Sequence, residues 1–234
     1  MTNPIIVPLD LPTEAALQLA RELAPVVGAF KIGNELFTAA GPEIVTAIRR
    51  MGAPVFLDLK FHDIPNTVAG GVASATRLDV QMLTVHCAGG LRMLEAAERA
   101  AQETARAAGR SAPLVLGVTV LTSLDGTDLE NVGVQSGVEK QVERLALLAL
   151  RAGLRGLVCS PLEVAPLRKV LPPAMQLVTP GIRAAQDALG DQRRTMSAKE
   201  ALAAGANWLV IGRPIYASAN PRKSAEEILA SLQP

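Results

Sequence analysis

Eight short apolar runs recur along this chain, and each is followed by a segment in which apolar residues repeat with helical periodicity. Within the runs the apolar residues are nearly continuous, which is typical of strands whose two faces are both covered. Strands that alternate with helices in this way favour a parallel sheet flanked by helices. The runs cover residues 5–10, 29–33, 55–60, 80–86, 114–121, 156–160, 176–179 and 208–212.

The intervening segments are predicted to be amphipathic helices. In one of them Ala16, Leu19 and Leu23 share a face, because residues three and four apart are neighbours on a helix. Residue types that commonly begin or end helices flank these segments. The predicted amino-terminal caps are Thr13 and Ser197, and the predicted carboxyl-terminal caps are Gly28, Gly52, Gly109 and Gly153.

Eight strand–helix units in 234 residues predict an α/β fold of the closed (β/α)₈ type, a TIM barrel, with residues 1–234 forming a single domain. The alternative is a doubly wound open sheet, which usually has fewer strands and a glycine-rich first turn. The sequence contains neither a G-x-G-x-x-G motif nor a Walker A loop. Because no linker or low-complexity stretch divides the chain, the single barrel is the preferred interpretation.

The composition limits the classes of partner. Lys and Arg total 23 against 22 Asp and Glu, so the net charge of +1 creates no global field for a nucleic-acid polymer or an anionic membrane. The longest segment without a charged residue, 111–124, is too short to span a bilayer. The first ten residues lack a basic start and a long apolar run, so we expect no signal peptide. Two isolated cysteines, Cys87 and Cys159, suit a cytoplasmic protein.

Polar residues collect where the predicted strands end. In barrels of this kind the chemistry lies at the carboxyl ends of the strands. A strand needs no charge, and a charge placed inside a barrel is costly unless it is paired, so a ring of charges indicates a ligand or a polar network. The residues at these ends are Asp10, Lys31, Asp58, Lys60, His86, Thr122, Ser123, Arg183 and Arg213.

Asp58 and Lys60 are the most informative pair. Residues two apart in a strand point the same way, so both side chains are predicted to face the barrel mouth while Leu57 and Leu59 pack on the helices. A single charge near a strand end is usually a solvated loop residue. Two charges on one face, with Lys31 on the neighbouring strand, favour a functional site.

Other polar positions have simpler interpretations. Asp63 precedes Ile64 and Pro65, a pattern that fits a helix N-cap as well as it fits a catalytic carboxylate. His86 lies on an apolar strand and is interpreted as a hydrogen-bonded core residue. Cys87 and Cys159 are interpreted as buried packing residues.

A glycine lies close to an arginine at the ends of two consecutive predicted strands. The segment T-P-G-I-R ends at Arg183, and I-G-R-P-I contains Gly212 and Arg213. Glycine permits close backbone approach and arginine offers a bidentate fork, so the two segments favour a phosphate site, which barrels commonly place here. Gln192 is a further candidate donor.

The lysines limit the kinds of reaction that the predicted site could catalyse. A Schiff base needs a neutral amine, whereas a carboxylate at Asp58 favours the charged ammonium of Lys60. Lys60 is therefore predicted to donate a proton rather than to act as a nucleophile. A fixed ammonium suits a reaction in which negative charge develops on carbon. Histidines and carboxylates with clear metal-ligand spacing are absent from the sequence, so we expect no metal.

These motifs together resemble the orotidine 5'-phosphate decarboxylase family. The resemblance runs from Asp10 to about Pro214, with the motifs in the family's order. The matching segments are D-L-K-F-H-D-I-P-N-T at 58–67, F-K-I-G at 30–33, L-T-S at 121–123, T-P-G-I-R at 179–183, G-D-Q at 190–192 and I-G-R-P at 211–214.

The resemblance implies the last step of de novo pyrimidine synthesis, the decarboxylation of orotidine 5'-monophosphate to uridine 5'-monophosphate and CO₂ without a cofactor. It implies that Lys60 protonates C6 of the pyrimidine within a charge array that includes Lys31, Asp58 and Asp63. It also implies a homodimer in which Asp63 and Thr67 reach the neighbouring subunit's site. The implied substrate-binding residues are Asp10, Lys31, Asp58, Lys60, Asp63, Ile64, Thr67, Thr122, Ser123, Arg183, Gln192, Gly212 and Arg213.

Within that set, the resemblance implies that Asp10 and Lys31 hold ribose hydroxyls and that Thr122 or Ser123 contacts the pyrimidine edge. It assigns Arg183, Gln192, Gly212 and Arg213 to the phosphate. The segments 125–136 and 184–195 are the longest predicted loops, and we expect them to act as lids over the substrate.

Two alternatives stay open. A sugar-phosphate decarboxylase or aldolase of the same barrel superfamily shares an Asp-x-Lys-x-x-Asp core but uses Mg²⁺. A catalytically silent nucleotide-phosphate binder would keep the arginines and use the lysines only structurally.

Overall fold

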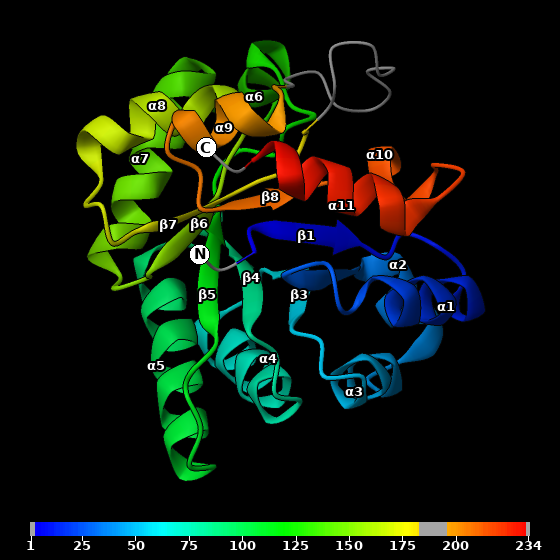
Figure 1. The fold of residues 1–234 in the computed structure, drawn as a ribbon. Coiled ribbons are helices and arrows are strands. Elements are labelled where there is room, and N and C mark those ends of the chain that lie inside the picture. Colours follow the sequence, from blue (N-terminus) through cyan, green and yellow to red (C-terminus); the bar gives the residue numbers. More distant parts are fainter. Residues whose placement is uncertain (1–2, 183–195, 233–234) are drawn as a thin grey trace.

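The computed structural model describes residues 3–182 and 196–232, and the strands in these ranges form one closed parallel barrel in chain order (Figure 1). This arrangement confirms the predicted (β/α)₈ fold. The strands are β1 (Ile5–Pro8), β2 (Ala29–Gly33), β3 (Val55–Phe61), β4 (Met82–His86), β5 (Leu114–Val118), β6 (Gly156–Val158), β7 (Gln176–Thr179) and β8 (Trp208–Val210).

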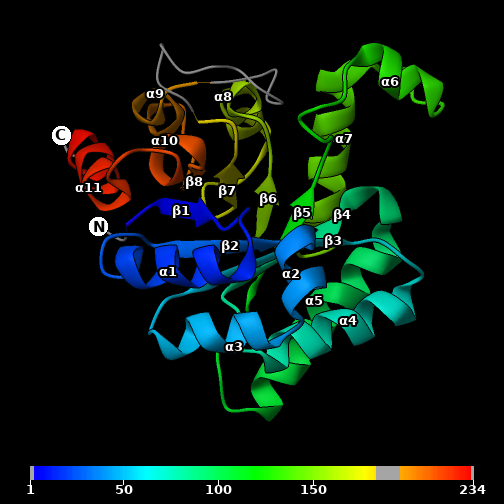
Figure 2. The ribbon, with the colours of Figure 1, turned by 90° about the vertical axis from the view of Figure 1, so that its right-hand side faces the viewer.

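Helices surround the barrel in both views (Figures 1 and 2). A single 3₁₀ turn, η1 (Cys87–Gly89), separates β4 from the helix that follows it. The helices are α1 (Thr13–Leu23), α2 (Asn34–Ala40), α3 (Glu43–Arg50), α4 (Pro65–Arg77), α5 (Leu91–Ala107), α6 (Gly126–Asn131), α7 (Gly137–Arg151), α8 (Pro161–Val170), α9 (Ala198–Ala203), α10 (Arg213–Tyr216) and α11 (Pro221–Ser231).

The apolar core has two layers, because successive residues of a strand face opposite sides of the sheet. The larger layer lies between strands and helices and includes Phe30 and Leu57. The smaller layer fills the barrel interior and forms the floor beneath the open carboxyl end. Its buried members are Ile6, Ala29, Phe56, Met82, Leu116, Val178 and Val210.

Several strands are shorter than the predicted runs. β1 ends at Pro8, which pairs with Lys31 of β2, and β5 ends at Val118, which pairs with His86 of β4 and Val158 of β6. Asp10 and Thr122 therefore lie in the loops that follow these strands. Both loops lie at the carboxyl end of the barrel, where polar residues were predicted to gather.

The two predicted N-caps have different outcomes. Ser197 caps α9 as predicted, because its side chain accepts from the N–H of Glu200 while the Glu200 carboxylate accepts from the N–H of Ser197. The prediction for Thr13 is wrong, since Thr13 is the first residue of α1 and Pro12 occupies the cap position. Proline has the extended backbone required there and lacks an N–H that would need a partner.

Three of the four predicted C-terminal glycines are confirmed. Gly52, Gly109 and Gly153 follow the last turns of α3, α5 and α7 with positive φ angles of 79°, 63° and 82°. The prediction for Gly28 is wrong, because this residue lies beside the start of β1 rather than at a helix end. A Cβ there would collide with the carbonyl oxygen of Asn3. None of the described helices has the length and apolar character that a membrane crossing requires.

Candidate active site

The end of β3 departs from a regular strand. Leu57 pairs with Leu83 of β4, whereas Phe61 pairs with Val85, so β3 contains two extra residues between these pairs. This irregularity is a β-bulge, a feature that re-aims side chains and is frequent near active sites. Lys60 lies within it and has a φ of 51°, in the left-handed region that non-glycine residues rarely adopt.

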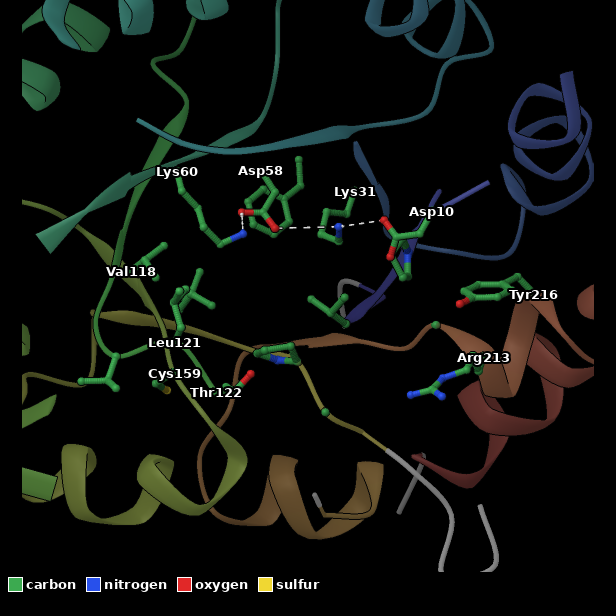
Figure 3. A pocket seen from close by; sticks show the side chains of 18 residues that line it. Asp10, Lys31, Asp58, Lys60, Val118, Leu121, Thr122, Cys159, Arg213 and Tyr216 are labelled. Carbon is green, nitrogen blue, oxygen red and sulfur yellow. Dashed lines mark hydrogen bonds and ion pairs between the residues drawn. The ribbon is translucent and has the colours of Figure 1, made fainter. Parts of the chain in front are cut away.

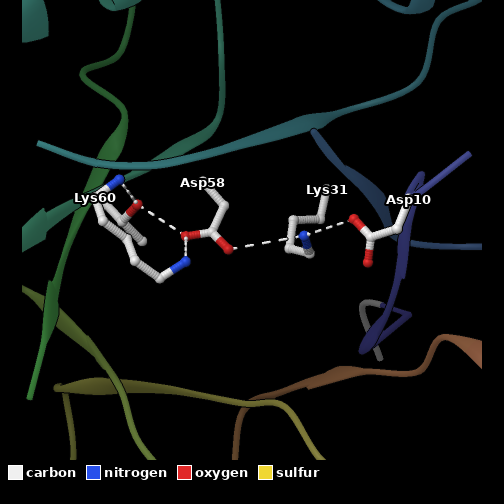
Figure 4. A network of polar contacts seen from close by, with 5 residues as sticks. Asp10, Lys31, Asp58 and Lys60 are labelled. Carbon is white, nitrogen blue, oxygen red and sulfur yellow. Dashed lines mark hydrogen bonds and ion pairs between the residues drawn. The ribbon is translucent and has the colours of Figure 1, made fainter. Parts of the chain in front are cut away.

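Asp58 and Lys60 still face the same cavity, as predicted, although a regular alternating strand is the wrong description of how they do so. Lys60 Nζ donates to Asp58 Oδ1 at 3.0 Å. Asp58 Oδ2 lies 3.8 Å from Lys31 Nζ, which donates to Asp10 Oδ1 at 3.2 Å. The four side chains form a row in which positive and negative charges alternate (Figure 4).

The row is largely removed from water at its centre. The side chains of Asp58 and Lys31 are 13% and 14% exposed. Charges this deeply placed are tolerated because each faces an opposite charge. We call this set, Asp10, Lys31, Asp58 and Lys60, the charge row.

A glycine leaves room for the row. A Cβ at Gly33 would lie 3.1 Å from Lys31 Nζ and 3.6 Å from Asp10 Oδ1. The first distance is shorter than ordinary contacts, so a side chain here would push the ammonium away from its carboxylate. Gly33 therefore permits the ion pair between β2 and the loop after β1.

The charge row forms one wall of a cavity of about 250 Å³ at the carboxyl end of the barrel (Figure 3). Val118, Leu121 and Cys159 form the opposite wall, and Thr122 adds a hydroxyl to it. Phe56 from the inner core layer also lines the cavity. The site thus combines one charged wall with one mostly apolar wall.

Arg213 and Tyr216 lie at the end of the cavity away from Lys60 (Figure 3). Arg213 is the first residue of α10, directly after Gly212, and Gly181 from the segment after β7 lines the cavity as well. The structure therefore brings together described parts of both glycine–arginine segments. A guanidinium and nearby glycines suit an anionic group at this end.

Two predicted phosphate residues, Arg183 and Gln192, lie outside the described residues, as does the predicted lid 184–195. The other predicted lid, 125–136, contains the short helix α6. Asp125 caps it by accepting from the N–H of Asp128, whose side chain accepts from the N–H of Asp125. The prediction that this whole segment is a loop is therefore wrong.

Comparison with family models agrees with this geometry. The model described as the Orotidine 5'-phosphate decarboxylase / HUMPS family matches residues 3–228, nearly the whole chain. This chain belongs to that family.

Individual members of the orotidine 5'-phosphate decarboxylase / HUMPS family are similar over their full length. Proteins named orotidine 5'-phosphate decarboxylase from Moorella thermoacetica and Pseudomonas aeruginosa are 52% and 51% identical over 231 residues, covering 98% of this chain and 92% and 97% of the relatives. The crystal structure of orotidine 5'-phosphate decarboxylase from Lactobacillus acidophilus matches with a TM-score of 0.87 and 35% identity, covering 99% of this chain and all of the other.

The family resemblance assigns Asp63, Ile64 and Thr67 to substrate binding, but these residues do not line the cavity of this chain. Asp63, Ile64 and Thr67 are exposed, and the Ile64 side chain is 67% accessible. Pro65 begins α4 and Ile64 occupies the cap position, so the N-cap interpretation of Asp63 is wrong. The Asp63 carboxylate instead accepts from the N–H of Ile64 at 2.6 Å.

His86 behaves differently from a hydrogen-bonded core histidine. Its ring stacks on that of His62 with centroids 5.2 Å apart. Its Nδ1 is buried and has no hydrogen-bond partner within residues 3–182 and 196–232, so the prediction is wrong at this atom. Burial lowers the pKa of His86, and the positive charges of His62 and Lys60 lower it further.

The two cysteines are buried, as predicted, and form no disulfide with each other. Burial raises the pKa of the Cys87 thiol to about 12, which keeps it protonated. Cys159 packs too, but it also lines the cavity, a position that its sequence context did not indicate.

Tyr216 is the polar cavity residue that sequence reasoning missed. It lies three residues after Arg213, which places the two on one face of α10, so the spacing alone was a usable signal. Of the pair predicted to contact the pyrimidine, Thr122 lines the cavity and Ser123 does not. Among the described residues, no group of three or more His, Cys, Asp or Glu side chains is placed to hold a metal ion.

Proposed function

We propose that this chain catalyses the decarboxylation of orotidine 5'-monophosphate to uridine 5'-monophosphate and CO₂. The observation that carries the proposal is the charge row, which ends at Lys60, facing a cavity whose far end holds Arg213. Two relatives about half identical to this chain carry that activity in their names, which supports the same reaction here.

The cavity has a polarity that suits a nucleotide. The 5'-phosphate would lie beside Gly212 and Arg213, together with Arg183 and Gln192. The ribose hydroxyls would meet Asp10 and Lys31, which pair at 3.2 Å. The pyrimidine would then lie between the charged wall and the wall formed by Val118, Leu121 and Cys159, and its edge would meet Thr122 or Ser123.

In the proposed reaction the bond between C6 and the carboxylate breaks, CO₂ leaves, and the electron pair stays on C6. The Lys60 ammonium stabilises this charge and then transfers a proton to C6, which yields the uridine nucleotide. The neutral amine regains a proton from water. Because no cofactor accepts the electron pair in this scheme, fixed charges of the protein supply the stabilisation.

Asp58 has two roles in this scheme. Its Oδ1 holds the Lys60 ammonium at 3.0 Å, and its other oxygen faces Lys31. The row thereby fixes the ammonium before the substrate binds, so little reorganisation is needed as charge develops. The departing carboxylate would lie near Asp58, and loss of CO₂ would relieve the contact between the two anions.

We further propose that the active form is a homodimer in which Asp63, Ile64 and Thr67 complete the neighbouring subunit's site. Residues 62–67 form a continuous exposed stretch directly after the charge row, and the large apolar side chain of Ile64 is open to solvent. This stretch offers one large apolar side chain and several polar groups to a neighbouring subunit. We place this reaction in the cytoplasm, which two cysteines without a disulfide between them favour.

A spectrophotometric assay with orotidine 5'-monophosphate tests the proposed reaction. We expect the substrate to be converted to uridine 5'-monophosphate, with the same rate in the presence of EDTA. Activity that EDTA abolishes and Mg²⁺ restores would support the sugar-phosphate alternative. Binding of uridine 5'-monophosphate without any turnover would support the silent binder.

Mixing two inactive variants tests the shared site. In a mixed dimer of Lys60→Ala and Asp63→Ala subunits, one site carries both defects and the other carries neither. Random association of equal amounts should therefore restore about a quarter of the wild-type activity, as expected for a symmetric dimer. An equal mixture that stays as inactive as its components would refute the contribution of Asp63 across the interface.

A further inference from the structure

Thr84 lies in β4 opposite the bulge of β3, and its side chain is fully buried. The bulge disrupts the regular ladder between the two strands after Leu57, so the backbone N–H of Lys60 needs another acceptor. The Thr84 hydroxyl supplies it, at a distance of 2.9 Å from the nitrogen. A side chain therefore replaces the missing backbone partner.

The same hydroxyl reaches the charge row. Thr84 Oγ1 donates to Asp58 Oδ1 at 2.9 Å, and that oxygen also accepts from Lys60 Nζ at 3.0 Å. Backbone, hydroxyl, carboxylate and ammonium thus form a closed ring that begins and ends at Lys60. A hydroxyl has a single proton, so accepting from the Lys60 N–H directs that proton toward Asp58.

The ring stabilises a conformation that is unfavourable by itself. The φ of 51° at Lys60 lies in the left-handed region, which is energetically costly for a non-glycine residue. A buried N–H left without an acceptor would add to that cost. Without the hydroxyl, the bulge would relax toward backbone conformations that satisfy this N–H differently, and the Lys60 side chain would move with it.

We propose that Thr84 is a positioning residue for the reaction, which sets the direction of the Lys60 ammonium through the backbone of Lys60 and through Asp58. This inference rests on the proposed function, because a fixed direction of the ammonium matters for the reaction only if Lys60 acts in catalysis. Thr84 does not line the cavity, so we expect it to make no contact with substrate. It acts through Lys60 and Asp58 alone.

Thr84→Val tests the role, because valine keeps the shape and removes the hydroxyl. We expect kcat to fall roughly 10- to 100-fold, since small misplacements of reacting groups have effects of this size. The KM and the Kd for uridine 5'-monophosphate should change little, because the proposed phosphate and ribose contacts remain. Thr84→Ser, which restores the hydroxyl, should recover most of the lost kcat.

Thr76→Val is the matched control. Thr76 is also a buried threonine, but its hydroxyl donates only to the Val72 carbonyl within α4. We expect this variant to keep the wild-type kcat. Should Thr84→Val fail to fold, Thr84→Cys provides a side chain of similar size with a weak donor, and the same fall in kcat is expected.

Three outcomes would overturn the inference. These are a wild-type kcat in Thr84→Val, equal losses in Thr84→Val and Thr84→Ser, or a rise in KM without a fall in kcat. A wild-type protein that does not decarboxylate orotidine 5'-monophosphate would instead refute the proposed function. The two failures are thus distinguished by the wild-type assay.

Discussion

The two ends of the barrel use charged side chains in different ways. At the carboxyl end, Lys31 and Lys60 meet carboxylates and line an open cavity. At the amino end, Arg168 and Arg155 donate to backbone carbonyls that precede the strands. Side chains paired with each other across a cavity can exchange those partners for a ligand, whereas arginines bonded to the backbone fix the chain itself.

Arg168 shows the amino-end pattern most fully. It donates to the carbonyl oxygens of Gly205 and Met175 at 2.8–2.9 Å and to the side chain of Asn207. These contacts tie α8 to the segments that enter β7 and β8. Burial lowers the pKa of Arg168, yet arginine stays charged because its usual pKa is far above neutral.

Asp79 joins two more arginines at that end. Its carboxylate accepts from Arg49 at 2.6 Å and pairs with Arg110 at 3.2 Å. The Arg49 guanidinium is the main reason that the pKa of Asp79 lies below its usual range. Charged side chains at the amino end therefore stabilise the fold, whereas those at the carboxyl end line the site of the proposed reaction. This division of roles is testable.

The largest expected effect concerns activity at the carboxyl end. Lys60→Ala should lower kcat by at least about 10⁴-fold, because it removes both the proton donor and the fixed cation. The Tm should not fall, and the Kd for uridine 5'-monophosphate should stay near the wild-type value. A variant that keeps even a few per cent of the wild-type rate in the steady-state assay would remove Lys60 from this role.

The next effect concerns stability at the amino end. Arg168→Ala should lower the free energy of unfolding by about 3 kcal/mol, because two backbone carbonyls and the Asn207 side chain lose a charged donor. The kcat of the folded fraction should not change. Arg222→Ala is the control, since Arg222 makes an exposed pair with Glu226 in α11 and its loss should cost less than about 0.5 kcal/mol. Urea unfolding measures the free energy of unfolding of both variants. Equal losses in the two would contradict the stabilising role of the amino-end arginine.

The smallest expected effect concerns His86 at the carboxyl end and the pH dependence of the free energy of unfolding. Because the pKa of His86 is lowered in the folded protein, protons bind the unfolded chain more readily. This contribution to stability is present above the usual histidine value of about 6.5 and is lost as pH falls through the lowered folded value. The free energy of unfolding should therefore decrease between about pH 7 and pH 5.

His86→Gln should flatten this decrease, whereas His62→Gln should keep most of it, because burial of His86 is the main cause of the lowered pKa. Urea titrations at a series of pH values measure both slopes. Asp79 does not contribute in this window, since the stability from its lowered pKa is lost only at more acidic pH. An unchanged slope in His86→Gln would show that another group is responsible.

The barrel could be predicted from the sequence because continuous apolar runs leave few choices. A run such as 114–121 needs cover on both faces, and alternation with helices supplies it. The charges of Asp58 and Lys60 could be recognised as candidates for a site because the packing of a barrel core does not require charged residues. Their contact at 3.0 Å confirms that they face the cavity together.

The bulge could not be predicted, because it depends on how β3 aligns with β4 rather than on β3 alone. Thr84 was hidden for a related reason, since a threonine in an apolar strand looks like an ordinary strand former. Asp125 and Asp128 did carry a signal for α6, as an acidic residue three positions after a capping residue marks a helix start. Positions in loops are set by tertiary packing, which local sequence does not encode.

The barrel closes by pairing its first strand with its last. Ile5 and Ile6 pair with Leu209 and Val210, about 200 residues further along the chain. During synthesis on the ribosome, β1 emerges first and its outer edge keeps unpaired N–H and C=O groups until β8 arrives. Closure of the barrel must therefore wait until β8 has been translated, and the nascent chain carries an open strand edge until then.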